Sequence, residues 1–457
     1  MGLLNSAELL LQTKNYSGSG NWLDEANSHD ATNNGALFLP YIGQKYLYLP
    51  GINNNNAEVP TDVSLDLTED VEIRLDLQLD DYSPASSNET FTRYVSTGNH
   101  RQFRLVVTTA GNLQFGIGDG SGAFRADFAV ASGLTDGQRY QLRIVLDGDD
   151  GAGNTDVSFY QRPADEALDA DTVAWAQIGT TQTDVGLQTW KAVTAPIEVG
   201  SRLSQFVSIG RIYRALYWKD LTKTDLAVDI HFDDPGVVEP YSTFTELSPN
   251  GATVTINRTA TGVKATLVDR PLWLLGGNDH LEVADDAGLD VTASDAATLM
   301  VWGRIYDTSP DEDQVLVGKK DNLTTSAGYT LYVESADATA KFLIGDGSLD
   351  DEDPTPNLTV GQGFVITGVK NETDDDIESF LDGTGGSAVT DSTTATLANA
   401  LAFNIGASSN ATPASYLDGE VFAVVFWNVA LSDADVAKAG RELTTLLPNA
   451  IMLMGVG

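Results

Sequence analysis

The stretch "FRLVVTTAGNLQFGIGDGSG" (Phe103–Gly122) alternates apolar and polar side chains on both sides of a short polar turn. It returns as "YTLYVESADATAKFLIGDGSL" (Tyr329–Leu349), and both copies contain Ile-Gly-Asp-Gly-Ser. Alternation with a period of two is typical of half-buried β-strands. Each copy therefore predicts two antiparallel strands joined by a turn, with a second tight turn at Gly-Asp-Gly.

Other landmarks repeat in the same order along the chain. Three segments have a later counterpart: Asn21–Thr32 with Thr243–Val254, Ala57–Thr68 with Leu281–Thr292, and Ile212–Leu226 with Val421–Val436. The last pair runs through a tryptophan to Thr-x-x-Asp (Thr222, Asp225) or Ser-x-x-Asp (Ser432, Asp435), which is a helix N-cap signature. Matches in one order indicate that the chain is an internal duplication.

The fold class follows from the spacing of these strands. Each copy holds about ten short strand candidates separated by Gly, Asn and Asp turns, which is typical of an antiparallel sandwich. One short helix is evident, in "SDADVAKAGRELTTLL" of the second copy. We therefore predict an all-β chain of two tandem antiparallel β-sandwich (jelly-roll) domains.

The predicted division of the chain has its main boundary near Pro235, where prolines, a glycine and acidic residues interrupt the pattern. It comprises an N-terminal arm (1–20), a first sandwich (21–235), a second sandwich (236–448) and a C-terminal tail (449–457). The apolar ends "LLNSAELLL" and "PNAIMLMGVG" belong to neither repeat. They either pack onto the protein's own fold or dock on a neighbouring protein, and the sequence leaves both open.

The charge balance excludes several kinds of partner. Asp and Glu number 65 against 26 Lys and Arg, which gives a formal net charge of −39. A field of this sign repels nucleic acid and anionic membranes. The chain has no cysteine, so disulfides and thiolate metal sites are excluded. The first sixteen residues lack the pattern of a signal peptide, and we expect synthesis in a cytoplasm.

The same charge predicts a dependence of stability on salt, typical of a halophilic protein. Mutual repulsion of the carboxylates is unscreened at low ionic strength, so removing salt is expected to lower the melting temperature, and adding it back to restore the value. Thermal melts from low to molar salt test this. A flat profile would contradict a saline role for the charge.

Taken together, these phrases resemble the concanavalin A-like lectin/glucanase superfamily in its laminin-G-like branch. The segments on which this resemblance rests are "NWLDEANSHDAT", "YLYLPG", "PLWLLGGNDHLEVAD", "GYTLYV…FLIGDGS" and the closing "W…LSDADV". The pairing of modules over about residues 21–448 is similar to virion and minor tail proteins of tailed viruses. The resemblance implies a virion-surface or tail-associated protein, made in the host cytoplasm. Its expected partners are other virion proteins, copies of itself and host glycans.

The glycine-rich repeats do not predict a nucleotide site. Gly116, Gly118, Gly120 and Gly122 fit neither G-x-G-x-x-G nor G-x-x-x-x-G-K-[ST], and no helix signal follows them. A strand that enters a tight turn explains them, because glycine allows a positive φ and aspartate bonds to its own backbone. The repeat is a duplicated turn.

Calcium is the one cofactor that the composition supports, because hard cations prefer clustered carboxylates. The candidate ligands are loop aspartates: Asp119, Asp346, Asp147, Asp149, Asp150 and Asp156. None fits the EF-hand spacing, and solvated acidic loops are the alternative in so acidic a chain.

Catalytic constellations are missing from the sequence. The glucanase motif Glu-x-Asp-x-x-Glu is absent, since "EDVEIRLD" lacks the last glutamate, and the four histidines do not form a metal motif. We expect no enzymatic activity. Among the aromatic residues, Trp22, Trp175 and Trp190 stand beside polar loop residues and are the candidate glycan platforms.

Two functions remain. The first is a non-enzymatic structural or decoration protein of a virion, with two lectin-like modules on the particle surface. The second is a carbohydrate-binding adhesin that recognises host glycans, assisted by calcium.

Overall fold

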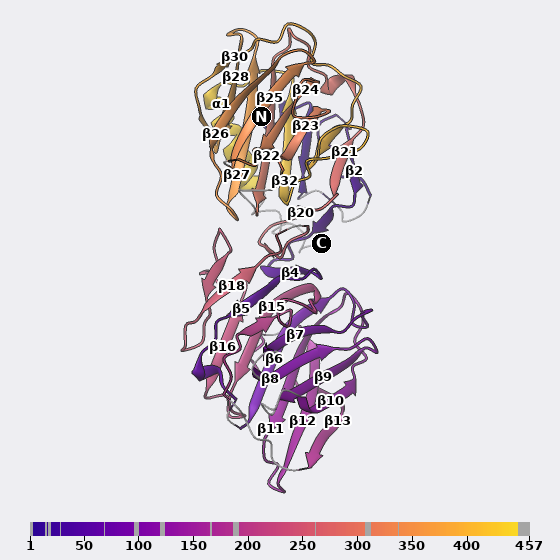
Figure 1. Ribbon diagram of the computed structural model, residues 1–457, viewed down its shortest axis with the longest axis vertical. Helices are drawn as coiled ribbons and strands as arrows, with labels where there is room; N and C mark the ends of the chain where they lie inside the picture. The colour runs from indigo at the N-terminus through magenta and orange to yellow at the C-terminus, as the bar shows by residue number, and fades with distance from the viewer. Residues whose placement is uncertain are drawn as a thin grey trace. The chain divides into compact units, whose positions relative to one another are not determined.

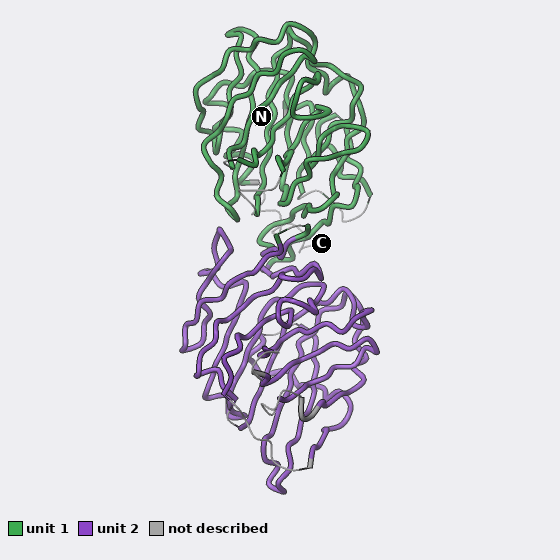
Figure 2. Tube along the Cα trace, viewed as in Figure 1, with its two compact units in different colours: residues 1–43, 260–263, 268–457 green, residues 44–259, 264–267 purple. Residues whose placement is uncertain are grey.

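The computed structural model describes residues 3–13, 16, 20–27, 29–67, 69–95, 100–118, 124–164, 167–185, 192–260, 262–306, 312–336 and 338–446. The chain forms two compact units (Figure 2). Unit 1 comprises Met1–Gly43, Ala260–Val263 and Val268–Gly457, and unit 2 comprises Gln44–Thr259 and Lys264–Leu267. No helix in the described part of the chain is long and apolar enough to cross a membrane.

Unit 2 is a sandwich of two antiparallel sheets (Figure 1). The first, called the β6 sheet, has the order β13 (Ala176–Val185), β12 (Asn154–Pro163), β11 (Arg139–Asp147), β6 (Val71–Leu79), β15 (Ile209–Trp218), β4 (Tyr46–Pro50) and β19 (Thr266–Val268), with β16 (Leu226–His231) paired to β15. The second, the β7 sheet, has the order β10 (Phe124–Ala131), β9 (Asn112–Gly118), β8 (His100–Val107), β7 (Asn88–Val95), β14 (Ile197–Val199), β5 (Asn56–Val59), β18 (Thr253–Asn257) and β17 (Thr243–Thr245).

Unit 1 repeats this architecture. Its β22 sheet has the order β29 (Thr384–Gly385), β28 (Asp376–Leu381), β27 (Gly363–Asn371), β22 (Ala297–Ile305), β32 (Gly419–Trp427), β20 (Leu272–Leu275) and β3 (Leu37–Leu39), with β1 (Leu9–Gln12) on β32 and β30 (Val389–Thr390) on β28. Its β23 sheet has the order β2 (Ala31–Asn34), β21 (His280–Val283), β31 (Phe403–Ile405), β23 (Gln314–Lys320), β24 (Ala327–Val333), β25 (Thr339–Asp346) and β26 (Asp350–Asn357). The predicted pair of antiparallel sandwiches is confirmed.

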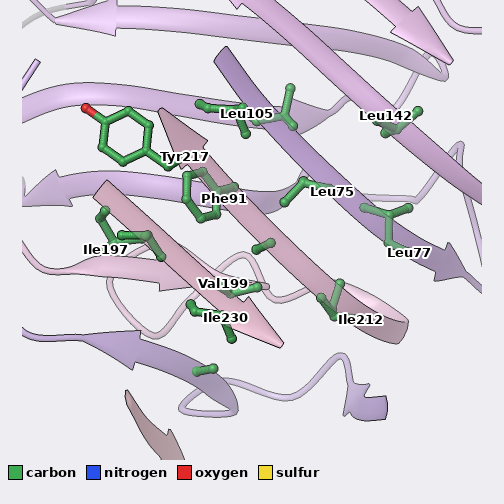
Figure 3. Packing of buried hydrophobic residues seen from close by; sticks show 14 of the residues in the cluster. Leu75, Leu77, Phe91, Leu105, Leu142, Ile197, Val199, Ile212, Tyr217 and Ile230 are labelled. Carbon is green, nitrogen blue, oxygen red and sulfur yellow. The ribbon is translucent and has the colours of Figure 1, made fainter. Parts of the chain in front are cut away.

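Alternation along the strands explains why the sheets stack. In β6, "VEIRLDLQL", the side chains of Ile73, Leu75 and Leu77 enter the core, and those of Glu72, Arg74 and Asp76 point to the other face. Figure 3 shows Leu75 and Leu77 facing apolar side chains of the opposite sheet, among them Phe91 and Leu105. A close-packed apolar layer of this kind is the main source of a sandwich's stability.

Short elements outside the sheets confirm the duplication. The 3₁₀ turns η3 (Val63–Leu65) and η5 (Ala287–Leu289) occupy equivalent places in the two copies. Asp62 caps the first by accepting from the Ser64 amide at 2.7 Å, and Asp286 caps the second through the Gly288 amide at 2.7 Å. The same residue type therefore caps the same turn in both units.

The predicted helix caps have different outcomes. Helix α1 (Asp433–Leu446) follows Ser432, whose hydroxyl accepts from the Asp435 amide at 3.3 Å, so this N-cap is confirmed. Thr222 and Asp225 begin no helix, because the Asp220 carboxylate accepts from the amides of Thr224 and Asp225 and fixes a turn that leads into β16. A third short 3₁₀ turn, η1 (Leu3–Ser6), contacts α1.

The first strands of each repeat complete the sandwich of the other repeat. β1 pairs with β32, β2 with β21 and β3 with β20, so the beginning of the chain belongs to unit 1. In the equivalent way β16 pairs with β15, β18 with β5, and β19 lies beside β4, so the start of the second repeat belongs to unit 2.

This exchange corrects the predicted boundaries. Residues 21–43 do not belong to the first sandwich, residues 236–259 and 264–267 do not belong to the second, and residues 3–13 of the predicted arm are an integral edge of unit 1. The physical reason is burial, since Leu9 and Leu11 are 0% exposed within the unit 1 core. The predicted tail, 449–457, lies outside the described residues.

A buried carboxylate anchors each exchanged segment. Asp24 accepts from the amides of Leu10, Ala26, Asn27 and His29 at 2.9–3.1 Å. Burial alone would raise the pKa of Asp24, but these amide bonds lower it. Glu246 anchors the equivalent segment of unit 2, where it accepts from the amides of Asp229, Ser248 and Ala252 at 2.7–3.0 Å.

Candidate functional site

A row of polar side chains crosses the outer face of the β6 sheet in unit 2. Its members lie directly opposite one another on five neighbouring strands: Arg162, Gln141, Asp76, Arg214 and His231. Charged groups on a sheet face need partners when they are buried, and here Arg162 and Gln141 are almost wholly buried. The row therefore forms a polar surface on the outer face of the sheet.

Two arginines of this surface are fixed by bidentate ion pairs. Arg139 donates to Asp76 through Nε and Nη2 at 2.7 and 2.8 Å, and its guanidinium carbon lies 3.6 Å from the centre of the Tyr213 ring. Arg214 donates to Asp229 at 2.9 and 2.8 Å, and to Asp169 at 2.9 Å. Such fork-to-fork pairs hold side chains in one orientation, so the wall is rigid.

A cavity of about 350 Å³ opens on this surface. Its lining comes from the start of unit 2, strands β6, β11 and β15, the loop after β12, and the end of β16 with the residues after it: Gln44, Lys45, Asp76, Arg139, Ala164, Ala167, Leu168, Tyr213, Arg214, His231 and Asp233. Eight of these eleven side chains are polar or charged. The cavity therefore suits a small polar ligand.

Three groups in the wall retain hydrogen-bonding capacity. Lys45 donates its amide to Asp233 Oδ1 at 2.9 Å and its Nζ to the carbonyls of Val237 and Asp234, which leaves one ammonium donor. The second carboxylate oxygen of Asp233 accepts no hydrogen bond from the residues that the structure describes. The ring of His231 has no hydrogen-bond partner among the described residues.

His231 is held in its neutral form. Burial lowers the pKa of this imidazole, and the nearby positive charge of Arg214 lowers it further. A neutral imidazole offers one N–H donor and one acceptor nitrogen, whereas the protonated ring only donates. At neutral pH this wall therefore presents both kinds of hydrogen-bonding group.

The loop above the cavity is held by two buried arginines. Arg74 donates to the carbonyls of Leu168 and Ala170 at 2.8 and 3.2 Å, and Arg162 donates to the Ala167 carbonyl at 2.8 Å. Both guanidinium groups lie over the ring of Trp175, at 5.2 and 4.2 Å from its centre. The predicted glycan platform Trp175 is thus partly buried and packs against these arginines.

The equivalent row of unit 1 has different side chains. The row there has Val365, Trp302, Ala423 and Gln12, which lie directly opposite one another on four neighbouring strands. These side chains are buried. Helix α1 also lies on unit 1, where it contacts β29. The side chains of this row are a feature by which the two copies have diverged.

Of the other two predicted glycan platforms, the structure describes Trp22. Trp22 is 1% exposed and packs against Trp273, with ring centres 5.9 Å apart, so it is a core residue and the surface prediction for it is wrong. Trp190 lies outside the described residues. Of the two predicted tryptophans that the structure describes, Trp175 lies near the cavity, where it supports the loop.

The predicted calcium ligands serve turns in the structure. Asp346 accepts from four amides, and those of Thr394 and Leu349 hold its pKa well below the usual range. Four more bond locally: Asp147, Asp149 and Asp150 to amides of their own loop, and Asp156 to the Thr183 hydroxyl. Asp119 lies outside the described residues. In the described part of the chain no group of three or more His, Asp or Glu side chains could hold a metal ion.

Comparison with protein families gives one match. Residues 275–437, within unit 1, match the family model described as the concanavalin A-like lectin/glucanases superfamily. The comparison with curated proteins found no match. The second repeat therefore carries a superfamily signature, in agreement with the resemblance of the sequence.

Solved structures similar to this chain include domains LG4-5 of the mouse laminin α1 chain, with 13% identity, a TM-score of 0.31, and coverage of 86% of this chain and 90% of that one. Another is the CBM40 of the Ruminococcus gnavus IT-sialidase bound to α2,3-sialyllactose, with 12% identity, a TM-score of 0.28, and coverage of 35% and 95%. The NanB sialidase from Streptococcus pneumoniae matches with 17% identity, a TM-score of 0.27, and coverage of 31% and 23%. At these scores no residue of this chain is assigned by correspondence.

Proposed function

We propose that this chain is a non-enzymatic carbohydrate-binding protein, and that the cavity on the outer face of unit 2 is its binding site. The observation that carries the proposal is the polar cavity of about 350 Å³, whose wall carries Asp76 and Arg214 where the duplicated copy has Trp302 and Ala423. The superfamily match over residues 275–437 supports a lectin-type function for the fold. The cavity volume lies at the small end of ligand sites and suits one or two sugar rings.

The available groups fit sugar hydroxyls. A hydroxyl both donates and accepts, so it is satisfied by a donor and an acceptor placed close together. His231 supplies both, Asp233 accepts, and Lys45 donates. The arginines of the wall are already paired with carboxylates, so a neutral or weakly charged sugar is favoured over a strong anion.

Binding without cleavage follows from how the carboxylates are engaged. Glycoside hydrolysis uses two carboxyl groups beside the scissile bond, one as an acid and one as a nucleophile or base. Of the two carboxylates that line the cavity, Asp76 accepts a bidentate arginine pair and Asp233 accepts the Lys45 amide. An arginine-paired carboxylate is a poor proton donor, so we propose that bound sugar stays intact.

Filling the cavity tests the assignment. Ala167→Trp places an indole in the space, and we expect at least about a tenfold loss of affinity, or ~1.4 kcal/mol, for the best ligand of a glycan array. Ala152→Trp, in an exposed loop away from the cavity, is the matched control and should bind normally. Equal binding by both variants would show that the glycan binds elsewhere on the protein. An assay for released reducing ends, run alongside, would contradict the non-enzymatic proposal if product rose with protein.

The pH profile of binding tests the role of His231. Because its pKa is lowered from the ordinary value of 6.5, the neutral ring persists below that pH. Affinity is expected to be constant from about pH 8 to 6.5 and to fall in more acidic solution, as the acceptor nitrogen takes up a proton. His231→Asn keeps a donor and an acceptor but does not titrate, and should flatten the profile. Calorimetric titrations across this range measure the effect.

Two further predictions stand beside this proposal. Calcium assistance is tested by repeating the glycan array with a chelator. Display on a virus particle, implied by the resemblance in sequence, is tested by locating the protein on particles with an antibody. No binding on the glycan array, together with antibody labelling of the particles, would favour the decoration role.

A further inference from the structure

The chain contains two equivalent closing segments. The N-terminal closing segment, residues 3–39, holds β1, β2 and β3, and the internal closing segment, residues 226–268, holds β16, β18 and β19. Each adds strands at the same three places, since β32, β21 and β20 of unit 1 correspond to β15, β5 and β4 of unit 2.

Equivalent side chains anchor the two segments. Leu11 of β1 lies opposite Val424, and Ile230 of β16 lies opposite Ala215; both are 0% exposed. Asp24 and Glu246 fix the following loops through amide bonds. A closing segment is therefore a self-contained part that fits a sandwich lacking its first strands.

The two segments differ in how they are connected. The internal closing segment follows directly on β15, the strand that it completes. The N-terminal closing segment reaches its sandwich from the far end of the sequence, because Leu9 pairs with Phe426. Its only covalent link within the chain is the connection Pro40–Lys45, which leads into β4 of unit 2 and includes Gly43 at a φ of +92°.

From this arrangement we infer that the unit 1 sandwich accepts the N-terminal closing segment of a second copy of this chain. Exchange replaces each contact by an identical one, so the free energies of the closed monomer and the exchanged pair differ only through effective concentration. A flexible tether corresponds to about millimolar effective concentration. Monomers dominate dilute solutions, and exchange grows where copies are crowded together.

The absence of cysteine allows a direct test in the full chain. Thr32 of β2 lies opposite Glu282 of β21, at a register where a disulfide can form. Chains with Thr32→Cys and chains with Glu282→Cys, carrying different tags, are mixed, unfolded, refolded together and oxidised. We expect a mixed disulfide dimer whose yield rises in proportion to total chain concentration.

Two controls decide the outcome. Glu58→Cys places a thiol at the equivalent position of β5, which the internal closing segment already occupies, so its mixture with Thr32→Cys should give no dimer. The double variant Thr32→Cys/Glu282→Cys should form an intrachain disulfide at high dilution. The inference is overturned if mixed dimers are absent, if they form equally with Glu58→Cys, or if the double variant forms no intrachain bond.

Discussion

Leu11→Asp is expected to unfold unit 1, most of which lies more than 250 residues further along the chain, while unit 2 stays folded. Leu11 is 0% exposed in the unit 1 core, opposite Val424 of β32. The substitution removes the leucine's packing and buries an unpaired carboxylate, at a combined cost of at least about 5 kcal/mol. That is comparable with the whole stability of a typical domain.

Limited proteolysis followed by mass spectrometry measures this effect. Cleavage is expected throughout 268–446, with residues 44–259 protected. The matched variant is Ile230→Asp, which occupies the equivalent position in β16 and should expose unit 2 instead. If residues 1–20 were a surface arm, Leu11→Asp would change stability by no more than about 0.5 kcal/mol, and both units would stay protected.

The second large effect is expected for Glu72→Ala, which should destabilise unit 2 by about 3 kcal/mol. Glu72 is 0% exposed and accepts from Arg74 at 2.6 Å and from Arg143 at 2.8 Å. Its removal leaves the Arg74 guanidinium, also 0% exposed, with one carboxylate fewer. Breaking one side of a buried pair is costly because the other charge stays out of water.

The equivalent residues of unit 1 suggest a double variant that should restore the stability of unit 2. Thr298 and Met300 of β22 occupy the places of Glu72 and Arg74, as their register against β32 shows. Glu72→Thr/Arg74→Met should recover stability to within about 1 kcal/mol of the parent, because both charges are gone. Glycan binding should not recover, since Arg74 holds the loop above the cavity. Denaturant unfolding and glycan titration on the same samples separate the two effects, and a double variant no more stable than Glu72→Ala would contradict the account.

Much of the fold could be predicted because strands and turns are local. Alternation gave the strands around the repeated Ile-Gly-Asp-Gly-Ser, and the ordered matches gave the duplication. The assignment of strands to sandwiches could not be predicted. Two copies with the same pattern accept each other's first strands equally well, so the sequence of β2 or β18 is compatible with either partner. The observed pairings of β1 with β32, β2 with β21 and β18 with β5 reveal which one is chosen.

The site was missed for a related reason. Glu72, Arg74 and Asp76 alternate with apolar residues, which reads as an ordinary solvated face. The informative signal was the difference between copies, since the second has "ATLMVWGRI" where the first has "VEIRLDLQL". A strand face that has Glu72, Arg74 and Asp76 in one copy and Thr298, Met300 and Trp302 in the other indicates a changed role for that face. His231 and Asp233 had no such signal, because the residues that join them to the cavity wall are remote in sequence.

Because β1 completes unit 1, the two units are completed in a fixed order during translation. Unit 2 is complete when the ribosome has delivered residue 267, whereas β1 must wait for β32, about 400 residues after it emerges. At typical elongation rates this wait is roughly 20–80 s. Throughout it, the apolar "LLLQ" of β1 has no partner strand and is available to chaperones. Maturation therefore proceeds in two stages, with unit 2 folding during synthesis and unit 1 closing only after its last strand has left the ribosome.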